Sequence, residues 1–318
     1  MNRKPVVIAV IVAILASIAA YSYSGSTGEL KGEVRVSGAW ALYPMMVKWA
    51  EEYQKIQPKV TIEVSAGGAG KGMADVLAGL VDIGMVSRDV YPEEIEKGAH
   101  YVSVTKDAVV ATVNKENPVL SDLLAKGVTR QVFYNIYIAG NLTTWGQVVG
   151  KPDVADEIRV YTRSDAAGAP ETWAKYLGKR QEDLRGIGVY GDPGLLEAVG
   201  KDRLGIGFNN IGYAYDIKTK QQVEVIRVVP IDINENGQID PEEDFYGAKD
   251  KIAEAIGLGV YPSPPARALH LVTKSKFTGV VKEFVEWILT DGQKYVEEAG
   301  YVQLPRDSIN EQLEKLEG

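Results

Sequence analysis

The sequence contains no cysteine and only two histidines, His100 and His270, in 318 residues. The absence of cysteine excludes disulfides, thiolate catalysis, iron–sulfur clusters and cysteine-ligated zinc sites. It also excludes the lipid-modified cysteine of a bacterial lipoprotein. Two histidines are too few for a histidine-rich metal site. Composition therefore excludes most thiol and imidazole metal chemistry.

Positive charge is also in short supply. The chain has 35 Lys and Arg residues against 43 Asp and Glu residues, a net charge of -8. This balance argues against non-specific nucleic-acid binding, which needs a basic surface. It is compatible with binding a small anion, because a few N–H groups and one or two arginines can hold one inside an acidic protein. The length suits two lobes of an ordinary soluble protein.

The first residues read as an export segment. Arg3 and Lys4 precede an apolar run over residues 6–20, and residues 21–28 are polar and small. The run of about 15 residues is short for a membrane-spanning helix, which needs about 20. The pattern predicts a signal peptide in residues 1–24, with an uncleaved N-terminal anchor left open. In either case we expect an exported body, in the periplasm or at the cell surface.

The body alternates strand-like and helix-like segments. Their order is strand, helix, strand, helix, strand, over residues 33–37, 44–56, 60–64, 73–80 and 81–86. Pro44 marks the first helix start, because proline favours the first turn of a helix. This βαβαβ order predicts an α/β fold with a parallel sheet. Two later strand-like segments, 108–113 and 268–273, are candidates for strands that cross between lobes, and 223–230 also reads as a strand.

Three turns rich in Gly or Ser lie where a predicted strand ends and a predicted helix begins. They are residues 37–44 (SGAWALYP), 65–72 (SAGGAGKG) and 163–170 (RSDAAGAP). Such turns point backbone N–H groups and the positive ends of helix dipoles at the carboxyl edge of the sheet, where ligands bind in α/β proteins. The second turn is no P-loop, because Gly72 follows Lys71. Together the turns predict an anion cradle.

Taken in order, these segments resemble the phosphate-binding proteins of high-affinity phosphate ABC importers. The resemblance runs from about residue 34 to the C-terminus. It is carried by SGAWALYP, SAGGAGKGM, VDIGMVSRDV, FYNIYIAGNLTTWGQ, YTRSDAAGAPETWAKYLG, DRLGIGFNNIGYAYD, ARALHLVTKS and DGQKYVEEAGYVQLP. It implies a two-lobed periplasmic-binding-protein fold with two crossover strands and a ligand cleft between the lobes. By this analogy lobe 1 comprises residues 32–106 plus 265–318, and lobe 2 comprises 107–264.

The resemblance also implies the site. The arginine, aspartate and glycine backbone of the family's R-x-D-G-S-G-T turn match Arg163, Asp165 and Gly168. Several of the family's hydroxyl-bearing positions hold other residues here: Ala167, Ala169, Ala69 and Leu42. Ser87 stands where some members have an acidic acceptor, followed by Arg88 as in other members. The residues expected to hold the oxyanion are Ala41, Leu42, Ala69, Gly70, Ser87, Arg88, Arg163, Asp165, Gly168 and Ala169.

These departures bear on which oxyanion binds. Lost hydroxyls weaken binding by several kcal/mol in total, at about 1.5–3 kcal/mol for each hydrogen bond to a charged group. Ser87 repels a fully deprotonated oxyanion less than a carboxylate does. We expect phosphate, with tungstate, molybdate or sulfate left open. Trp40 leaves open an organic phosphate, if it lines the cleft rather than packing under the first turn.

Residues 232–243 (DINENGQIDPEE) have the spacing of a calcium-binding loop. Oxygen-bearing groups occur at each ligand position of the EF-hand pattern. They belong to Asp232, Asn234, Asn236, Gln238 (through its carbonyl), Asp240 and Glu243. Gly237 occupies the position of the sharp turn. The sequence predicts a structural calcium ion that orders this loop of lobe 2.

The expected partners are a membrane permease and a small oxyanion, and we expect a monomer that binds no nucleic acid. A phosphoester hydrolase is an alternative, because Ser37, Ser87 and Ser164 lie in the candidate cleft. The turns contain no histidine and no metal cluster to activate them, so we expect no enzyme. An anchored sensor that keeps the fold is a third alternative.

Overall fold

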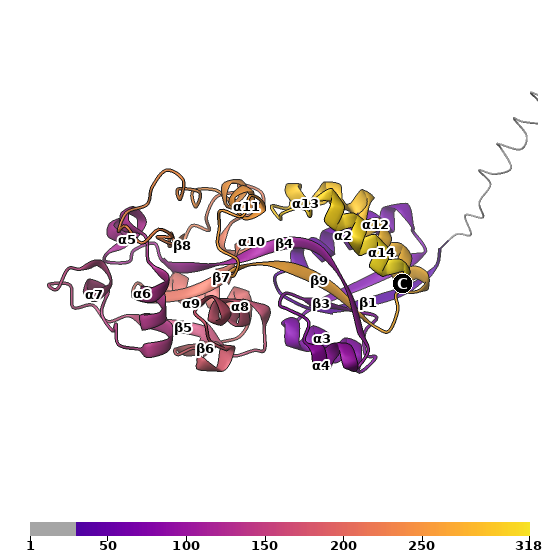
Figure 1. Cartoon of the computed structure of the whole chain (residues 1–318), viewed down its shortest axis with the longest axis horizontal. Helices are drawn as coiled ribbons and strands as arrows, with labels where there is room; N and C mark the ends of the chain where they lie inside the picture. The colour runs from indigo at the N-terminus through magenta and orange to yellow at the C-terminus, as the bar shows by residue number, and fades with distance from the viewer. Residues whose placement is uncertain (1–29) are drawn as a thin grey trace, which may run out of the picture.

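Two lobes joined by a pair of long strands make up the protein (Figure 1). The computed structural model describes residues 30–318, so the predicted export segment, residues 1–24, lies outside the described residues. One hydrophobic core gathers buried side chains between Val34 and Val104 and between Leu269 and Leu316. The other gathers side chains between Ala108 and Ala266, together with Val302. We call the parts around these cores lobe 1 and lobe 2.

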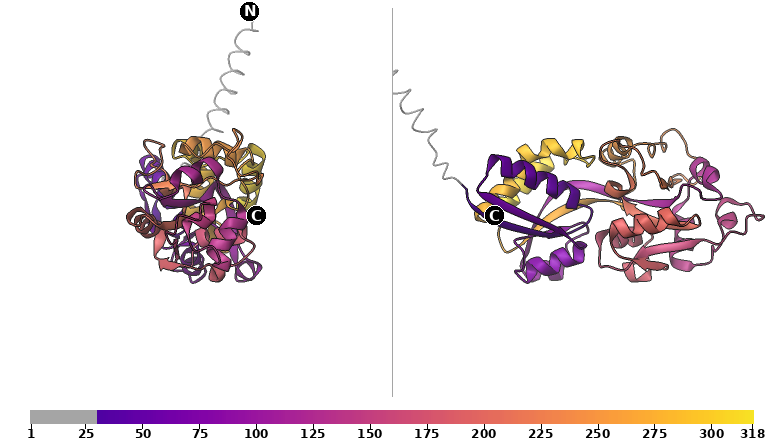
Figure 2. Two further views of the ribbon diagram at one scale, coloured as in Figure 1. Left: turned by 90° about the vertical axis from the view of Figure 1, so that its left-hand side faces the viewer. Right: turned by 180° about the vertical axis from the view of Figure 1, so that it is seen from behind.

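Lobe 1 is built on three parallel strands. The strands are β1 (Gly32–Gly38), β2 (Val60–Ala66) and β3 (Ile83–Val86), and the helices are α2 (Tyr43–Ile56), α3 (Ala69–Leu77), α4 (Pro92–Glu96), α12 (Gly279–Leu289), η3 (Asp291–Gln293), α13 (Lys294–Glu298) and α14 (Arg306–Glu317). Strand β1 pairs in parallel with β2 and β3, which confirms the predicted βαβαβ order. Helix α2 and the C-terminal helices cover one side of the sheet, and α3 covers the other (Figure 2).

Lobe 2 has shorter strands and more connecting segments. The strands are β5 (Arg159–Arg163), β6 (Ile187–Val189), β7 (Gly205–Asn210) and β8 (Ile226–Val228), and the helices are α5 (Leu120–Lys126), α6 (Arg130–Tyr134), η1 (Asn135–Ala139), α7 (Trp145–Val149), α8 (Gly168–Tyr176), η2 (Gln181–Asp183), α9 (Gly191–Lys201), α10 (Ile211–Ala214) and α11 (Lys249–Gly257). Strand β5 is parallel to both β6 and β7. The predicted strand over 223–230 forms only as the short β8.

The lobes are connected by an antiparallel ribbon of β4 (Ala99–Asn114) and β9 (Ala266–Lys274). Both run along the long axis of the molecule (Figure 1), and both predicted crossover segments lie in them. Strand β4 continues into lobe 2, where it pairs with β7 and β8. The sheet order is therefore β2-β1-β3-β9-β4-β7-β5-β6, with β8 on β4. Asp107 pairs with Arg267 in this ribbon, at the crossing between the cores.

The C-terminal helix α14 was not predicted from the sequence. Only two of its side chains, Gln312 and Leu316, are buried, so its apolar period is weak. It is fixed by both kinds of contact: Leu316 belongs to the core of lobe 1, and the side-chain oxygen of Gln312 accepts the Ser103 N–H at 2.9 Å. Within residues 30–318, none of the helices is long and apolar enough to cross a membrane.

Candidate functional site

The second and third Gly-rich turns meet across the boundary between the lobes. Ala69 begins α3 in lobe 1, and Gly168 begins α8 in lobe 2. The Gly70 N–H donates to the carbonyl of Ala166 at 3.0 Å, a hydrogen bond between the lobes. The predicted residues Ala69, Gly70 and Gly168 therefore lie close together, although 98 positions separate Gly70 from Gly168. Two helix N-termini, each with a partial positive charge, point at this boundary.

Glycine is required where the two backbones touch. A β-carbon at Gly168 would lie 2.1 Å from the Ser87 hydroxyl oxygen and 2.2 Å from its carbonyl oxygen. One at Gly70 would lie 2.8 Å from the β-carbon of Ala166. No side chain fits at these distances without moving the lobes apart. Ser87 is itself buried, so the structure places this predicted residue directly against the N-terminus of α8.

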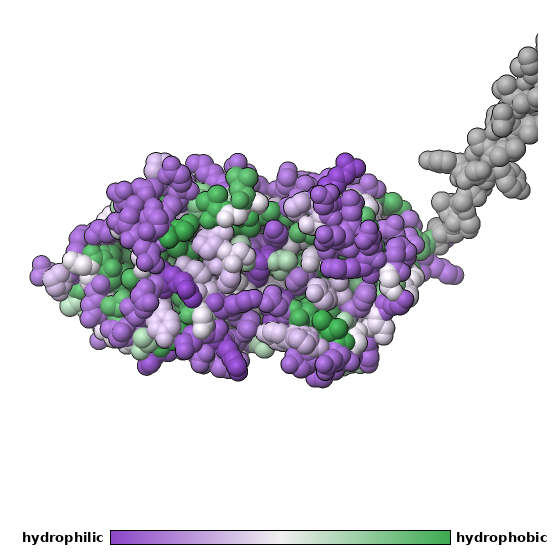
Figure 3. Space-filling model, viewed as in Figure 1, coloured by the Kyte–Doolittle hydropathy of each residue, from purple (hydrophilic) through white to green (hydrophobic). Residues whose placement is uncertain are grey.

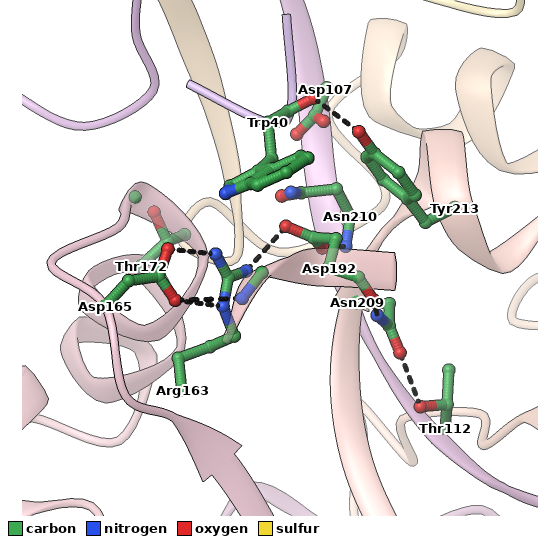
Figure 4. A network of polar contacts seen from close by, with 12 residues as sticks. Trp40, Asp107, Thr112, Arg163, Asp165, Thr172, Asp192, Asn209, Asn210 and Tyr213 are labelled. Atoms are coloured by element: carbon green, nitrogen blue, oxygen red, sulfur yellow. Dashed lines mark hydrogen bonds and ion pairs between the residues drawn. The ribbon is translucent and has the colours of Figure 1, made fainter. Parts of the chain in front are cut away.

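Arg163 ends strand β5 and is completely buried between two carboxylates (Figure 4). Its Nε and Nη2 donate to the two oxygens of Asp165 at 2.7 and 2.6 Å. Its Nη1 donates to Asp192 at 2.5 Å. Burial opposes the charge of Arg163, but Asp192 and Asp165 more than compensate and hold its pKa above the usual value. The predicted pairing with Asp165 is present, and the second carboxylate shares the same arginine.

Asp192 was missed by the sequence analysis. It lies in the first turn of α9 and its Oδ1 accepts the Asn210 N–H at 3.0 Å. Its carbonyl accepts the side-chain amide of Asn209 at 3.1 Å, and the Thr112 hydroxyl donates to that amide's oxygen at 3.1 Å. These residues are all buried. The available signal was the pair Asn209-Asn210 at the end of an apolar strand, since buried amides need partners.

Arg88 and Arg163 bind different carboxylates. Arg88 makes two hydrogen bonds to the carboxylate of Glu94, at 2.9 and 2.6 Å, and lies 4.2 Å from the centre of the Tyr91 ring. Burial lowers and Glu94 raises the pKa of Arg88, with a net shift upward. Tyr91 reaches lobe 2, where its hydroxyl donates to Glu171 at 3.0 Å. Arg88 therefore belongs to a second part of the boundary, beside a cavity of about 260 Å³.

A second buried arginine, Arg267, supports the start of α8 from the connecting ribbon. Its Nη1 donates to the Gly168 carbonyl and to the Thr172 hydroxyl, both at 2.8 Å, and its Nη2 donates to Asn210. Asp107 lies 3.4 Å from it. The signal in the sequence was an arginine at the start of an apolar strand, which we did not single out.

Asp107 is fully buried, and neither of its carboxylate oxygens has a hydrogen-bond partner among the described residues. Burial raises the pKa of Asp107 to about 7, although the nearby Arg267 acts in the opposite direction. Asp107 therefore changes its charge near neutral pH, because burial disfavours the ionised carboxylate.

The first turn lies beneath the boundary. Ala41 and Leu42 are buried; the Leu42 N–H donates to the Ala39 carbonyl at 3.1 Å, and the Ala41 carbonyl accepts the Tyr301 hydroxyl at 2.7 Å. These contacts engage the Leu42 N–H and the Ala41 carbonyl, and they do not involve the Ala41 N–H, which is the group predicted to bind the anion. Trp40 reaches lobe 2.

Trp40 packs against three residues of lobe 2. Its indole meets the Tyr190 ring edge-on, with centroids 6.1 Å apart, and its carbonyl accepts the Tyr213 hydroxyl at 3.3 Å. A β-carbon on Gly191 would lie 3.1 Å from the indole. The indole Nε1 is buried with no hydrogen-bond partner among the described residues (Figure 4). Trp40 therefore supplies a spare donor at the lobe boundary.

The predicted calcium loop is closed by hydrogen bonds of its own. The Asp232 carboxylate accepts the Asn236 and Gly237 N–H groups at 3.2 and 2.9 Å, and Glu243 accepts the Asn234 N–H at 3.1 Å. Asp240 accepts three side-chain amides, those of Asn234, Asn236 and Gln238. In residues 30–318 no three His, Cys, Asp or Glu side chains are gathered as a metal site. Side chains of the predicted ligand residues nevertheless contact one another, since three of them donate to Asp240.

The serines considered for catalysis lack a histidine partner. The Ser37 hydroxyl donates to Asp75 at 2.7 Å. His270 contacts the hydroxyl of Ser103 at 3.0 Å, in the connecting ribbon. Burial lowers the pKa of His270 to about 4. Both contacts fit structural roles.

A family model and curated relatives match most of this chain. A model described as PBP superfamily domain matches residues 24–292. The phosphate-binding protein PstS of Staphylococcus saprophyticus is 25% identical over 303 residues, which cover 92% of this chain and 87% of that protein. The phosphate-binding protein PstS of Staphylococcus aureus (strain USA300) is 26% identical over 302 residues, with coverages of 92% and 85%.

Solved structures show the same fold. A putative phosphate ABC transporter substrate-binding protein with bound phosphate, from Clostridium perfringens, superposes with a TM-score of 0.70 at 23% identity, covering 86% of this chain and 100% of that one. An ABC-type phosphate transport receptor from Vibrio cholerae has a TM-score of 0.61 at 22% identity, with the same coverages. These matches confirm the predicted α/β fold of the periplasmic-binding-protein type.

Proposed function

The chain belongs to the PBP superfamily, and on that premise we propose that it is the substrate-binding protein of an ABC importer and captures phosphate between its lobes. The observation that carries this proposal is the meeting of two helix N-termini, those of α3 and α8, across the lobe boundary. Backbone N–H groups at helix N-termini are a ready-made site for an anion. The names of the relatives from Staphylococcus support phosphate as the anion.

The binding energy in this proposal comes mainly from backbone groups. The Nε, Nη1 and Nη2 atoms of Arg163 donate to two carboxylates. Arg163 therefore holds the third turn in place and adds positive charge near the anion, rather than contacting the anion directly. The N–H groups of Ala69, Gly70, Gly168 and Ala169 are the donors we assign to the oxyanion. A bound anion would replace the hydrogen bond from Gly70 to the opposite lobe, because both need the same N–H.

Ser87 discriminates between phosphate and other oxyanions less strongly than a carboxylate would. Ser87 is neutral and lies against Gly168. Its hydroxyl oxygen therefore accepts a hydrogen bond from the hydroxyl group of hydrogen phosphate without strongly repelling sulfate. Trp40 adds an unpaired donor close to the same boundary. We therefore propose phosphate as the preferred ligand, with partial tolerance of other tetrahedral oxyanions.

We propose that the body works outside the cytoplasmic membrane, as a monomer, and delivers its ligand to a permease without catalysing a reaction. A phosphate-release assay with a generic phosphoester tests the last point. Turnover that depends on Ser37 or Ser87 would contradict it.

We propose in addition that residues 232–243 bind a structural calcium ion. The side-chain oxygens and the Gln238 carbonyl match the oxygen ligands that calcium prefers. Asn234 and Asn236 now turn their amide nitrogens to Asp240. Rotation of each amide brings its oxygen to the same place, so the change needed is small.

Isothermal titration calorimetry of residues 25–318 with phosphate, sulfate, tungstate and molybdate tests the main proposal. We expect saturable phosphate binding that is tighter than binding of the other three anions. Binding of tungstate or molybdate without phosphate would retain the class of protein and change its substrate. Silence with all four would overturn the proposal of an inorganic oxyanion.

A further inference from the structure

One surface loop of lobe 2 contains the triplet Asn141-Leu142-Thr143. It follows the pattern Asn-x-Ser/Thr, with a residue other than proline in the middle, that marks acceptors of N-linked glycans in exported proteins. The pattern occurs once in the 318 residues. Because it is short and arises by chance in many chains, its place in the fold decides whether it can be modified.

The loop joins η1 to α7 and is held in place mainly through its backbone. The Asn141 N–H donates to the Asn135 carbonyl at 3.2 Å. The Thr143 N–H donates to the side-chain oxygen of Gln147 at 2.8 Å. Between them, Leu142 is partly buried against the core of lobe 2. These contacts fix the chain on both sides of the asparagine.

The side chain of Asn141 itself is exposed. Within residues 30–318 its amide makes no hydrogen bond. Other asparagines of the same lobe differ, since Asn209 and Asn210 are buried and the Asn234 side chain donates to Asp240. The Asn141 amide is therefore open to an enzyme in the folded protein, and its modification breaks no contact of the fold.

A groove of about 460 Å³ lies beside this loop. Leu142 and Thr143 line it together with Arg159, Arg185 and Ile187. Ile187 is 56% exposed, and Figure 3 shows hydrophobic surface around α7 at this end of lobe 2. Such a lining suits sugars, because their C–H faces pack on apolar side chains and their hydroxyls accept hydrogen bonds from arginine.

The position of the loop is compatible with a bulky group. Ile187 belongs to β6, the last strand in the order of the sheet. Edge strands present unpaired backbone groups to other chains, so proteins commonly cover them. Figure 1 shows α7 at the end of lobe 2 that is farthest from lobe 1. A glycan on the loop before α7 therefore shields a sheet edge and leaves the lobe boundary clear.

We propose that Asn141 is N-glycosylated and that the first sugars of its glycan lie in the groove beside Ile187. The donor is an oligosaccharide carried on a polyprenyl phosphate outside the cytoplasmic membrane. A bond forms between Asn141 Nδ2 and the anomeric carbon of the first sugar, and the bond from that carbon to the phosphate oxygen breaks. The polyprenyl phosphate leaves, and the amide gives up one proton. This inference rests on the proposed location outside the cytoplasm.

Mass spectrometry of the protein purified from its native cells tests the site. We expect the tryptic peptide that contains Asn141 to carry sugar residues, which fragmentation assigns to this asparagine. Asn141→Gln and Thr143→Ala should each lose the added mass, whereas Thr143→Ser should retain it, because either hydroxyl completes the pattern. Asn310→Gln is the matched control and should keep the mass, since Asn310 is exposed but lies outside the pattern.

An unmodified Asn141 in the protein from native cells overturns the site, and so does added mass that persists in Asn141→Gln. Cell fractionation separates this result from the proposed function. An unmodified protein found outside the membrane overturns the site alone, whereas one retained in the cytoplasm overturns the proposed location as well. A glycosylated protein that binds no phosphate in calorimetry leaves the site standing and overturns phosphate capture.

Hydrogen exchange tests the placement of the glycan in the groove. We expect the amides around Ile187 to exchange more slowly in the glycosylated protein than in Asn141→Gln, because bound sugars hinder local opening. Equal exchange in the two proteins overturns this placement. Phosphate affinity should be the same in both, since the loop lies far from the turns of α3 and α8.

Discussion

Gly168 lies against Ser87 so closely that a methyl group at this position has no space. Gly168→Ala must therefore separate the turns of the two lobes, and we expect phosphate affinity to fall at least tenfold in calorimetry. Gly247→Ala is the matched control, because nothing lies within 4 Å of a β-carbon built there and its φ is ordinary. Circular dichroism checks that both variants fold. Unchanged affinity in Gly168→Ala would place the anion elsewhere.

The buried positive charge of Arg163 compensates the negative charges of two carboxylates, those of Asp165 and Asp192. Arg163→Met leaves Asp165 and Asp192 buried without a counter-charge, and breaking a buried pair typically costs about 3–5 kcal/mol. We expect urea denaturation to show a loss of this size. Arg159→Met, in the same strand, removes an arginine whose side chain is 60% exposed, and should cost less than about 1 kcal/mol. Equal losses in the two variants would contradict the buried network.

Asp107 makes stability depend on pH. Its folded pKa of about 7 lies above that of an unfolded aspartate, about 3.9. Its contribution to stability is therefore fully present below about pH 4 and is lost as the pH rises through 7. Asp107→Asn removes this ionisation, so we expect its melting temperature to exceed that of the unmodified protein at pH 8.5 and to approach it at pH 5.

The groups that face Asp107 are Arg267, Asp192 and Lys249. Burial lowers the pKa of Lys249 to about 8, so this lysine also loses charge as the pH approaches 8.5. It is present in both proteins, so the difference between their melting temperatures reports mainly on Asp107. Asp156→Asn is the control, because that carboxylate is partly exposed and pairs with Arg203. A melting-temperature difference that is constant from pH 5 to 8.5 would show that Asp107 does not titrate in this range.

Sequence distance explains which of these residues could be predicted. Arg163 and Asp165 are two positions apart in one turn, so their pairing was predictable. Asp192 is 29 positions from Arg163, and only the packing of α9 beside β5 brings them together. Asp107 and Arg267 meet because β4 and β9 run antiparallel through the boundary. Pairing of that kind is fixed by the tertiary structure and has no local pattern.

At the scale of elements, local patterns predicted those segments whose apolar residues recur clearly. The βαβαβ unit of lobe 1 and the crossover strands were predicted because their buried positions form regular series. The C-terminal helix was missed, since it is polar on most sides, although Leu316 packs in the core and Gln312 accepts a hydrogen bond from Ser103. The three turns were predicted to converge: the second and third touch, and in the first the Leu42 N–H donates to the Ala39 carbonyl.

The calcium loop gives a prediction at this scale. If residues 232–243 bind calcium, 1 mM calcium should raise the melting temperature by a few degrees, because a ligand at 100 times its Kd stabilises the folded state by about 2.7 kcal/mol. Asp232→Asn with Glu243→Gln should abolish the increase. Glu235→Gln, an exposed residue between two ligand positions, is the control and should retain it. Phosphate affinity should be the same with calcium and with EGTA, since the ion is structural.

At the scale of the whole molecule, the lobes meet on two sides of the connecting ribbon. On one side the Gly-rich turns touch, and ion pairs such as Lys175 with Asp89 bridge the lobes. On the other, Lys220 and Lys249 of lobe 2 donate to the Glu298 and Ala299 carbonyls at the end of α13. Because one ribbon connects both regions, a change in the lobe arrangement on ligand capture alters the contacts on both sides. A ligand shifts this arrangement only if it binds one arrangement more tightly than another.

The central claim is that phosphate binds where α3 and α8 meet. A crystal structure of residues 25–318 grown with phosphate tests it most directly. The account predicts a tetrahedral anion within hydrogen-bonding distance of the N–H groups of Gly70 and Gly168, with the bond from Gly70 to Ala166 replaced. Phosphate bound elsewhere, for example beside Arg88 in the neighbouring cavity, would contradict it.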